Sequence, residues 1–458
     1  MPEPALTGVI LAYFSLLSGY YITKELINLS KKVAFATLGC KVNQYETEAM
    51  SLLFKNKGYT LCDFDEICDI YVINTCTVTN MGDRKSRQMI RKAKKTNPNA
   101  IIAAVGCYAQ VSSDEIKKID GVDVVLGTND RKHIVEYIEN LKENEQFENV
   151  CEIRKVTDFE DLEIESYDEM ERAYIKIEEG CNEFCSYCII PYARGPVRSR
   201  SIDSIINEAK RLVNNGFCEI ILTGIHIASY GKDLKDGTLL IDVVENLAKI
   251  EGLKRIRLGS IEPRILKEDF IIRLKNTKKV CPHFHISLQS GCDATLKRMN
   301  RKYTCDEYLE SVSLLRKHFE NPNIATDIMV GFPLETDEDF LESVDFMKKV
   351  NFSDAHVFAY SNRKGTRADK MEGQIPPNIK DERSKIMSET VAVLKENYMK
   401  SFIGKSLNVL FEQRKDKFFE GTSDNYIKVF VQTDLDLTGK IIDVQITDIE
   451  DDYLIGTI

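Results

Sequence analysis

Residues 174–188 read YIKIEEGCNEFCSYC, a predicted strand followed directly by three cysteines with the spacing C-x3-C-x2-C. A zinc site usually needs a fourth Cys or His, but the next ones, Cys218 and His226, come at least 30 residues after Cys188. The four-cysteine spacing of two-cluster ferredoxins does not fit either. Three thiolates without a fourth protein ligand favour an iron–sulfur cluster with one iron open to another molecule.

An open iron of this kind suits chelation of the amino and carboxylate groups of S-adenosylmethionine, with the cofactor carrying the chemistry. Downstream, predicted strands alternate with helical stretches, and together with residues 173–179 they give six strands. This pattern predicts a (β/α)6 partial barrel with its chemistry at the carboxyl ends of the strands. The polar residues at those ends are Thr223, Ser260, Glu262, Gln289, Ser290 and Asp327. The glycines Gly224, Gly259, Gly291 and Gly331 lie there too, and they would let a ligand approach the backbone closely.

Upstream, the apolar runs 33–40, 69–76, 100–107 and 122–127 alternate with amphipathic stretches and predict an open parallel α/β sheet. Cys40, Cys76 and Cys107 each end one of the first three runs. Because ligands of open α/β sheets bind at the carboxyl edge of the strands, we expect these thiols to converge on a second open cluster. The alternative is three buried small hydrophobes. Asn43 with Glu46, and Ser112 with Glu115, have the spacing of a helix-capping box.

Two basic segments lie near these cysteines. Residues 83–95, DRKSRQMIRKAKK, carry seven Lys or Arg and one acid, and Arg84, Arg87, Arg91 and Lys95 share a predicted helix face. This face is either solvated or binds RNA. Residues 193–200, ARGPVRSR, contain Arg194 and Arg198, which belong either to a solvated loop or to a phosphate contact.

The 458 residues carry a net charge of −10, which argues against a general nucleic-acid coat, and 13 cysteines without a secretory signal, which indicate a reducing cytoplasm. Residues 8–22 lack charge but are shorter than the roughly 20 residues that span a bilayer. We therefore expect no membrane partner. From residue 401, short alternating runs predict a small five-stranded β-barrel, a type that often binds oligonucleotides, although its six Lys or Arg against eleven acids weaken that expectation.

With both cysteine trios placed, the sequence resembles the methylthiotransferase family of radical S-adenosylmethionine enzymes. The motifs that carry the resemblance include TLGCKVNQYET (37–47), NTCTVT (74–79), VGCYAQ (105–110), EGCNEFCSYCIIPYARG (179–195), GSIEP (259–263), SLQSG (287–291) and DIMVGFPLET (327–336). The resemblance implies a methylthiotransferase domain over 31–145, a radical domain over 165–395 and a TRAM domain over 400–458. Residues 1–30 form an extension outside the family pattern.

TLGCKVNQYE looks like the branch that acts on N6-threonylcarbamoyladenosine beside the tRNA anticodon. The resemblance implies that Cys181, Cys185 and Cys188 hold a radical-generating [4Fe–4S] cluster and that Cys40, Cys76 and Cys107 hold an auxiliary [4Fe–4S] cluster carrying the sulfur. One S-adenosylmethionine would methylate that sulfur, and a second would yield the radical that abstracts hydrogen from carbon 2 of adenine. An external electron donor and sulfur donor are implied as partners beside tRNA. We expect the cofactor-contacting residues to include Tyr187, Gly224, Ser260, Glu262, Gln289, Asp327 and Gly331.

Two alternatives stay open from the sequence. The first is a methylthiotransferase acting on isopentenyladenosine in tRNA or on a ribosomal protein. The second, of another class, is a non-catalytic iron–sulfur or zinc protein that binds RNA.

Overall fold

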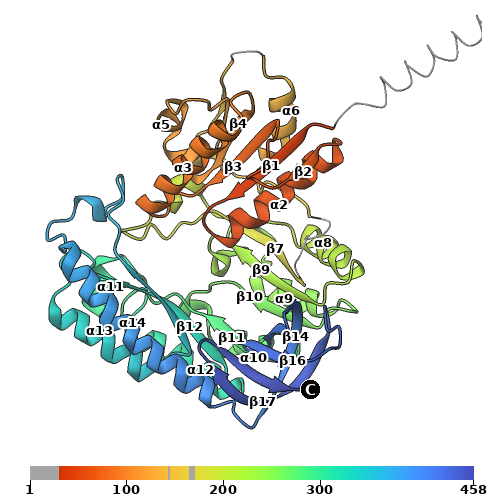
Figure 1. Ribbon diagram of the computed structural model, residues 1–458. Coiled ribbons are helices and arrows are strands. Elements are labelled where there is room, and N and C mark those ends of the chain that lie inside the picture. The colour runs from red at the N-terminus through yellow and green to blue at the C-terminus, as the bar shows by residue number, and fades with distance from the viewer. Residues whose placement is uncertain (1–29, 143–144, 165–170) are drawn as a thin grey trace, which may run out of the picture.

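The computed structural model describes residues 30–142, 145–164 and 171–458, arranged as an N-terminal sheet unit, a central partial barrel and a small C-terminal barrel (Figure 1). The predicted extension over 1–30 lies outside the described residues, apart from its last residue. No helix within the described ranges is long and apolar enough to cross a membrane.

The N-terminal unit is a six-stranded, all-parallel sheet in the order β2-β1-β3-β4-β5-β6, as the apolar runs predict. Neighbouring side chains of β1 face opposite cores: Val33 packs with Phe54 of α2, and Ala34 with Ile90 of α3. Both faces are therefore covered by helices. The strands are β1 (Lys32–Thr37), β2 (Thr60–Cys62), β3 (Ile70–Thr75), β4 (Ile101–Gly106), β5 (Val124–Leu126) and β6 (Phe147–Asn149). The helices are α2 (Lys41–Asn56), α3 (Asn80–Thr96), α4 (Cys107–Val111), α5 (Ser113–Lys117) and α6 (Ile134–Glu139).

Two details of this unit differ from the sequence prediction. The sheet continues past residue 145, because β6 pairs with β5. Neither capping box forms: α2 begins at Lys41, which places Asn43 and Glu46 inside the helix, and the Ser112 side chain makes no capping hydrogen bond.

The central unit is the predicted partial barrel. Sheet β10-β9-β7-β8 and sheet β11-β12-β13 meet through the bridges Ile256–Val280 and Ile261–Ile286, and among the described strands no pairing closes the barrel between its edge strands β8 and β13. The strands are β7 (Arg172–Glu179), β8 (Arg198–Ser199), β9 (Glu219–Gly224), β10 (Arg255–Leu258), β11 (His283–His285), β12 (Asn323–Val330) and β13 (Asp354–Ala359). The helices are α7 (Ile190–Arg194), α8 (Ile202–Asn214), α9 (Leu240–Ala248), α10 (Glu268–Asn276), α11 (Asp293–Arg298), α12 (Cys305–His318), α13 (Asp337–Val350) and α14 (Pro377–Lys400).

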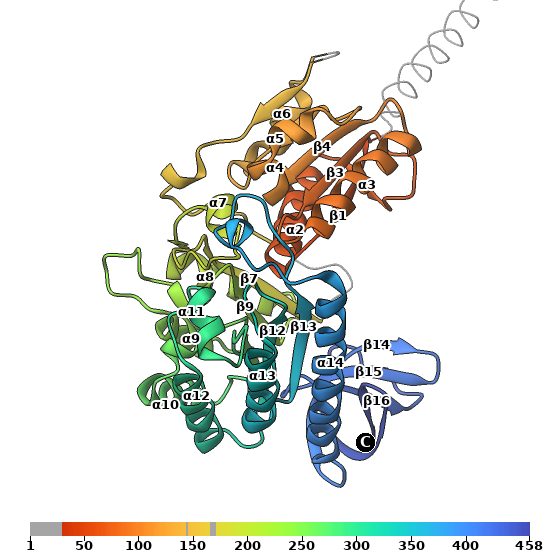
Figure 2. The ribbon, with the colours of Figure 1, turned by 90° about the vertical axis from the view of Figure 1, so that its left-hand side faces the viewer.

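Helix α14 runs beside β13 and leads into the C-terminal barrel (Figure 2). That barrel closes in the order β14-β15-β16-β18-β17, from β14 (Ser406–Lys415), β15 (Phe418–Ser423), β16 (Lys428–Gln432), β17 (Ile441–Glu450) and β18 (Tyr453–Thr457). The turn before β16 packs against the amino end of the central barrel. The Tyr426 ring lies tilted against His283 with ring centroids 4.5 Å apart, and Arg257 donates to the Asp424 carbonyl oxygen at 2.9 Å.

Candidate functional site

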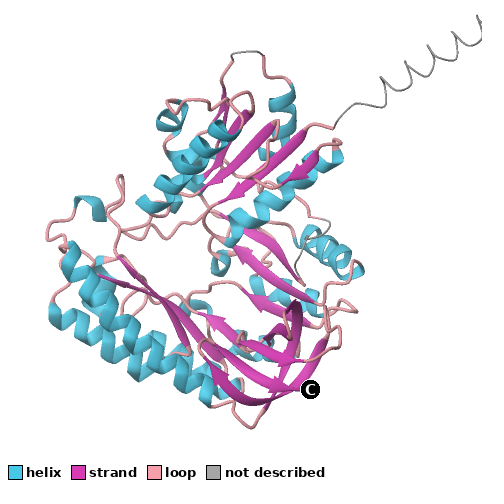
Figure 3. Ribbon diagram, viewed as in Figure 1, coloured by secondary structure: helices cyan, strands magenta, loops and turns pink. Residues whose placement is uncertain are grey.

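The first three candidate ligands lie at one edge of the N-terminal sheet. Cys40 follows β1, Cys76 follows β3 and Cys107 begins α4 after β4. The arrowheads of β1 and β3 point toward the central barrel, so this edge faces it (Figure 3). Burial is the main cause that raises the pKa of the Cys107 thiol to about 12; Arg194 opposes it, and the nearby thiols of Cys40 and Cys76 act in the same direction as burial. The structure thus brings the three thiols together.

A glycine makes room for this trio. Gly39 has a φ of +102°, and a Cβ there would lie 2.9 Å from both Cβ and Sγ of Cys76. Any side chain at position 39 would displace the neighbouring thiol.

The second trio occupies the loop that follows β7. The Cys181 amide donates to the Gly195 carbonyl oxygen at 3.0 Å, and the Cys188 amide donates to the Cys185 carbonyl oxygen at 3.0 Å. Burial, together with the neighbouring Cys185, raises the pKa of Cys188 to about 12. Arg301 donates from Nη1 to Sγ of Cys185 at 3.2 Å.

Arg194 contacts residues that lie near each of the two cysteine trios. It ends α7, which begins two residues after Cys188, and its Nε donates to Sγ of Cys107 at 3.1 Å. Its guanidinium also contacts Glu46 of α2 at 2.5 Å and Glu179 of β7 at 3.0 Å. The side chain is fully buried.

Arg194 belongs to a buried network of three basic and three acidic side chains that spans both units: Arg131, Lys176, Arg194, Glu46, Glu160 and Glu179. Although burial alone raises the pKa of Glu46, the cations around it hold that pKa well below its ordinary range.

These contacts correct one expectation from the sequence. Arg194 is fully buried, and Arg198 is 1% exposed and donates from Nη1 to the Arg194 carbonyl oxygen at 2.9 Å. Because both guanidiniums are enclosed by protein, neither offers a surface on which RNA phosphates could bind.

Several polar side chains surround the second cysteine loop at the mouth of the barrel, and sequence reasoning missed most of them. Donor atoms of Glu183, His226 and Glu262 lie within 4.8 Å of one another. Arg264 pairs with Glu183 at 2.7 Å and with Glu262 at 2.5 Å, and Arg301 lies 3.5 Å from Glu262. Of this cluster, the sequence analysis placed only Glu262 among the cofactor residues. The others come from four separate loops, and only their closeness in space identifies them.

The remaining expected cofactor residues are spread over the mouth and lumen. Tyr187 lies beside Arg301 and packs its ring 6.5 Å from that of Phe332. Ser260 Oγ lies 2.8 Å from His285 Nδ1, and His285 Nε2 lies 3.5 Å from a carboxylate oxygen of Asp327. Gln289 is largely buried, and its backbone adopts a φ of +75°.

The two glycines among the expected cofactor residues, Gly224 and Gly331, pack closely against other protein atoms. A Cβ on Gly224 would lie 2.8 Å from Ile227 and 2.9 Å from the Glu178 carboxylate. A Cβ on Gly331 would lie 2.4 Å from the Lys380 side chain. Packing against these neighbours is enough to explain a glycine at both positions, so Gly224 and Gly331 stay predicted cofactor contacts.

Helix α3 presents the predicted basic face. Arg84, Arg91 and Lys95 are exposed and form no ion pair with a described acidic residue, whereas Arg87 is half-buried and donates to the Tyr108 hydroxyl at 2.8 Å. A cavity of about 760 Å³ lies beside this helix and is lined in part by Asp83, Arg87, Ile189 and Arg363. Arg363 reaches from the loop after β13 to pair with Asp83. The cavity therefore adjoins both cysteine loops.

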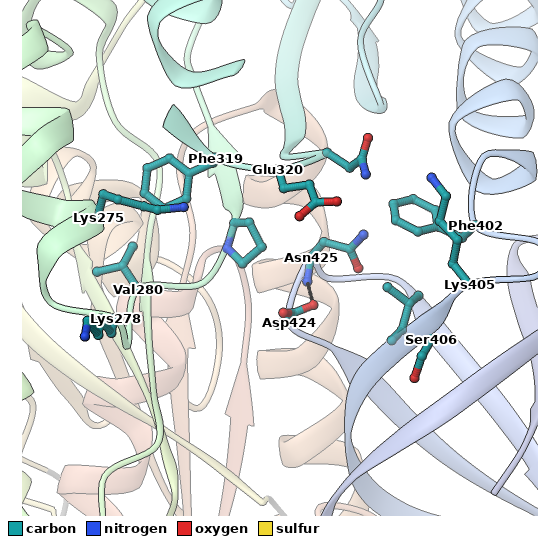
Figure 4. Close-up of a pocket in the computed structure, with 13 residues that line it drawn as sticks. Lys275, Lys278, Val280, Phe319, Glu320, Phe402, Lys405, Ser406, Asp424 and Asn425 are labelled. Atoms are coloured by element: carbon teal, nitrogen blue, oxygen red, sulfur yellow. Dashed lines mark hydrogen bonds between the residues drawn. The ribbon is translucent and has the colours of Figure 1, made fainter. Parts of the chain in front are cut away.

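A second cavity, of about 490 Å³, lies between the amino end of the central barrel and the C-terminal barrel (Figure 4). Lys275 and Phe319 line it on one side, and Phe402 and Lys405 on the other. Since the cysteine loops follow the carboxyl ends of their strands, this cavity lies away from them.

The donor atoms suit iron–sulfur clusters and a polar cofactor. Each trio supplies three thiols, the ligand type of iron–sulfur clusters, and an arginine contacts one thiol of each trio. At the barrel mouth, His226 Nε2 and Glu178 Oε1 are buried without a hydrogen-bond partner among the described residues. Such atoms fit a site that receives a polar ligand.

Comparison with protein families agrees with this division of the chain. Residues 32–127 match a model described as uncharacterized protein family UPF0004, and residues 175–347 match the radical SAM superfamily. A solved structure of the radical S-adenosylmethionine methyltransferase TsrM from Kitasatospora setae covers 72% of this chain and 73% of its own, with a TM-score of 0.54 and 15% identity. That likeness confirms the predicted fold over the part of the chain that it covers.

Curated relatives align over nearly the whole chain. The threonylcarbamoyladenosine tRNA methylthiotransferase MtaB of Bacillus subtilis (strain 168) is 44% identical over 90% of this chain and 93% of its own length. The MtaB of Aquifex aeolicus (strain VF5) is 40% identical over 87% and 96%. A tRNA-2-methylthio-N(6)-dimethylallyladenosine synthase of Acetivibrio thermocellus is 35% identical over 95% and 92%.

Proposed function

The chain belongs to the radical S-adenosylmethionine methylthiotransferases that modify tRNA, and we propose that its substrate is N6-threonylcarbamoyladenosine beside the anticodon. The enzyme is a sulfur-group transferase that uses [4Fe–4S] clusters and S-adenosylmethionine. This removes the non-catalytic RNA-binding alternative. Higher identity to the relatives named for threonylcarbamoyladenosine, 44% against 35% for one named for dimethylallyladenosine, supports the substrate proposal.

The observation that carries the mechanism is the hydrogen bond from Arg194 to Cys107, which joins the loop of one cysteine trio to a thiol of the other. Cys181, Cys185 and Cys188 would hold the radical-generating cluster, and Cys40, Cys76 and Cys107 the auxiliary cluster. When bound, these clusters supply the electron that cleaves S-adenosylmethionine and the sulfur that is transferred.

The protein's own residues position the reactants. Glu262 and Glu183 provide carboxylates beside the second trio for the amino group of S-adenosylmethionine, while Arg301 and Arg264 balance their charge. Tyr187, Ser260, Gln289 and Asp327 remain proposed contacts from the mouth and lumen, and Gly224 and Gly331 proposed backbone contacts. The charge network of Arg194 is itself shielded from solvent where the two units meet.

Two molecules of S-adenosylmethionine would be consumed for each product. One would give its methyl group to the sulfur and leave as S-adenosylhomocysteine. The other, on accepting one electron, would give methionine and the 5′-deoxyadenosyl radical, which becomes 5′-deoxyadenosine when it takes the hydrogen atom from adenine C2, where the C–S bond forms. An external donor would supply the electron that starts the cleavage, a sulfur donor would supply sulfur at the sulfide level, and one electron would be released as the C–S bond forms. An unactivated aromatic C–H bond offers no acid–base or nucleophilic route at neutral pH, which is the reason for a radical.

Exposed Arg84, Arg91 and Lys95 on α3 would bind the tRNA backbone, because they lack acidic partners among the described residues and lie on the helix whose Arg87 lines the cavity beside the cysteine loops. We further propose that the enzyme acts in the cytoplasm.

Nucleoside analysis of tRNA from a strain that lacks this gene tests the substrate. We expect 2-methylthio-N6-threonylcarbamoyladenosine to disappear and its unthiolated precursor to accumulate, with restoration by the plasmid-borne gene. Persistence of the methylthio nucleoside in a strain without a second such enzyme would contradict the proposal, and loss of a methylthio-dimethylallyl nucleoside would assign the other branch.

A further inference from the structure

A cavity of about 280 Å³ occupies the lumen of the central barrel, and charged and polar side chains stand among its mainly apolar walls. Its walls come from β7, β9, β10, β11, β12 and β13, and Tyr426 of the C-terminal barrel contributes to it from the amino end. The N-terminal unit contributes Lys41, the residue that follows Cys40. The cavity therefore connects the neighbourhood of the first cysteine trio with the inside of the barrel.

Lys41 brings a positive charge to this cavity that none of the described acidic groups balances. Its side chain is exposed, and its Nζ lies 5.1 Å from the ring centroid of Tyr174 and 3.4 Å from Gln44 Oε1. No described carboxylate forms an ion pair with it. The ammonium is thus free to bind an anion.

The other charged groups of the wall are already paired. Arg257 donates to Glu219 at 2.8 Å, and Asp354 lies 3.6 Å from Lys395. Among the described residues that line the lumen, Lys41 is the cation without an acidic partner.

Two buried polar atoms in the same wall also lack partners. His283 Nδ1 and Asn323 Oδ1 have no hydrogen-bond partner among the described residues, although His283 is 8% and Asn323 5% exposed. Burial lowers the pKa of His283 well below its ordinary value, and nearby Arg257 lowers it further, so the ring is neutral and offers one donor and one acceptor. Unpaired buried atoms of this kind fit a ligand with its own polar groups.

The two tRNA nucleosides named for the relatives differ in these properties. The threonylcarbamoyl group carries a carboxylate, a hydroxyl and a urea-like linkage, whereas the dimethylallyl group is a hydrocarbon. A carboxylate would balance the charge of Lys41, and the hydroxyl and the linkage would offer hydrogen-bond partners to His283 Nδ1 and Asn323 Oδ1. A hydrocarbon would leave the buried atoms of His283 and Asn323 unpaired, which is costly, and would leave the exposed Lys41 ammonium to solvent.

Resting on the proposed function, we propose that Lys41 binds the carboxylate of the threonylcarbamoyl group in the mouth of the barrel lumen and thereby selects this nucleoside over one with an apolar N6 substituent. Lys41 is a specificity residue: its position next to Cys40 would tie recognition of the substituent to placement of the adenine beside the first trio.

The first arm of the test changes the substrate and uses the wild-type holoenzyme. Two otherwise identical tRNAs carry either the free carboxylate or its carboxamide, and kcat/KM for methylthio transfer is measured for each. We expect the carboxamide to lower kcat/KM by roughly 10- to 100-fold, the range of a hydrogen bond to a charged group. Equal rates for the two substrates would overturn the inference.

The second arm changes the enzyme. Lys41→Gln should lower kcat/KM for the carboxylate substrate by a similar factor and react with both substrates alike, whereas Lys41→Arg should retain most of the discrimination. Lys57→Gln, at the exposed far end of the same helix, is the matched control. Iron content of each variant shows whether Cys40 still functions as a ligand, and if Lys41→Gln loses iron, Lys41→Arg and the substrate arm decide.

The outcomes separate this inference from the proposed function. A wild-type enzyme that modifies the threonylcarbamoyl tRNA but ignores its carboxylate contradicts the role of Lys41 alone. A wild-type enzyme that modifies only dimethylallyl tRNA contradicts the proposed substrate, and the inference with it.

Discussion

Arg194 donates a hydrogen bond from Nε to Sγ of Cys107, 3.1 Å away, across the boundary between the N-terminal sheet and the central barrel. Arg194 lies six residues after Cys188, so one rigid guanidinium links the loop of the second cysteine trio to a thiol of the first. The same side chain completes a buried network in which three cations face three carboxylates. Contact between the units therefore depends on charge balance at this point.

Replacing Arg194 with Gln should destabilise the protein. The substitution leaves one uncompensated carboxylate in the buried network, which costs about 3–5 kcal/mol. It also removes the donor to Cys107, so we expect loss of iron from the first trio before the second. Chemical denaturation and iron analysis with electron paramagnetic resonance measure the two effects.

Arg211→Gln is the matched control, because Arg211 is 37% exposed and pairs with the exposed Glu163. An exposed ion pair contributes only about 0–1 kcal/mol. If both variants unfolded at the same denaturant concentration, the proposed importance of the Arg194 network would be wrong.

The two cysteine trios should fail in different ways. Cys107→Ala should still release 5′-deoxyadenosine from S-adenosylmethionine but insert no sulfur, whereas Cys185→Ala should do neither. Cys62→Ala, a half-buried thiol of the N-terminal unit outside both trios, should retain both activities. Product analysis by mass spectrometry separates the cases, and full sulfur insertion by the Cys107 variant would contradict the division of labour.

Iron binding by the first trio should require glycine at position 39 for the space beside Cys76 as well as for its left-handed backbone conformation. Gly39→Ala places a methyl group 2.9 Å from Cys76 Sγ, whereas Gly58, also at positive φ, has nothing within 4 Å of its Cβ position. Both substitutions cost about 1–2 kcal/mol of left-handed strain, but only Gly39→Ala should lose iron from the first trio. Equal iron content in the two variants would show that the crowding at Cys76 is harmless.

Much of the fold follows from local patterns in the sequence. The apolar runs that end at Cys40, Cys76 and Cys107 become β1, β3 and β4, since continuous apolar segments identify strands covered on both faces. The three-residue strands β2 and β6 were missed because they are too short to show a periodicity. The capping boxes failed because spacing alone does not say where a helix begins.

The site was less predictable where partners come from distant segments. Arg194 and Arg198 appear in the sequence only as charges in a loop, and the carboxylate of Glu46 that accepts from Arg194 lies 148 positions earlier. Arg301 likewise reaches Cys185 from 116 positions away. Local sequence shows a charge but not its partner, so a buried ion pair and a solvated basic loop look alike.

The exposed face of α3 gives the last prediction. Arg84→Glu with Arg91→Glu should weaken tRNA binding and flatten its dependence on salt by roughly one unit of logarithmic slope for each lost phosphate contact. Arg87 is left unchanged because it supports Tyr108 through a 2.8 Å hydrogen bond. Lys210→Glu with Lys249→Glu, exposed on the outer side of the central barrel, changes the net charge equally. If both pairs shifted the slope alike, binding would reflect overall charge, and α3 would be only a solvated face; a change confined to the α3 pair would place the tRNA backbone there.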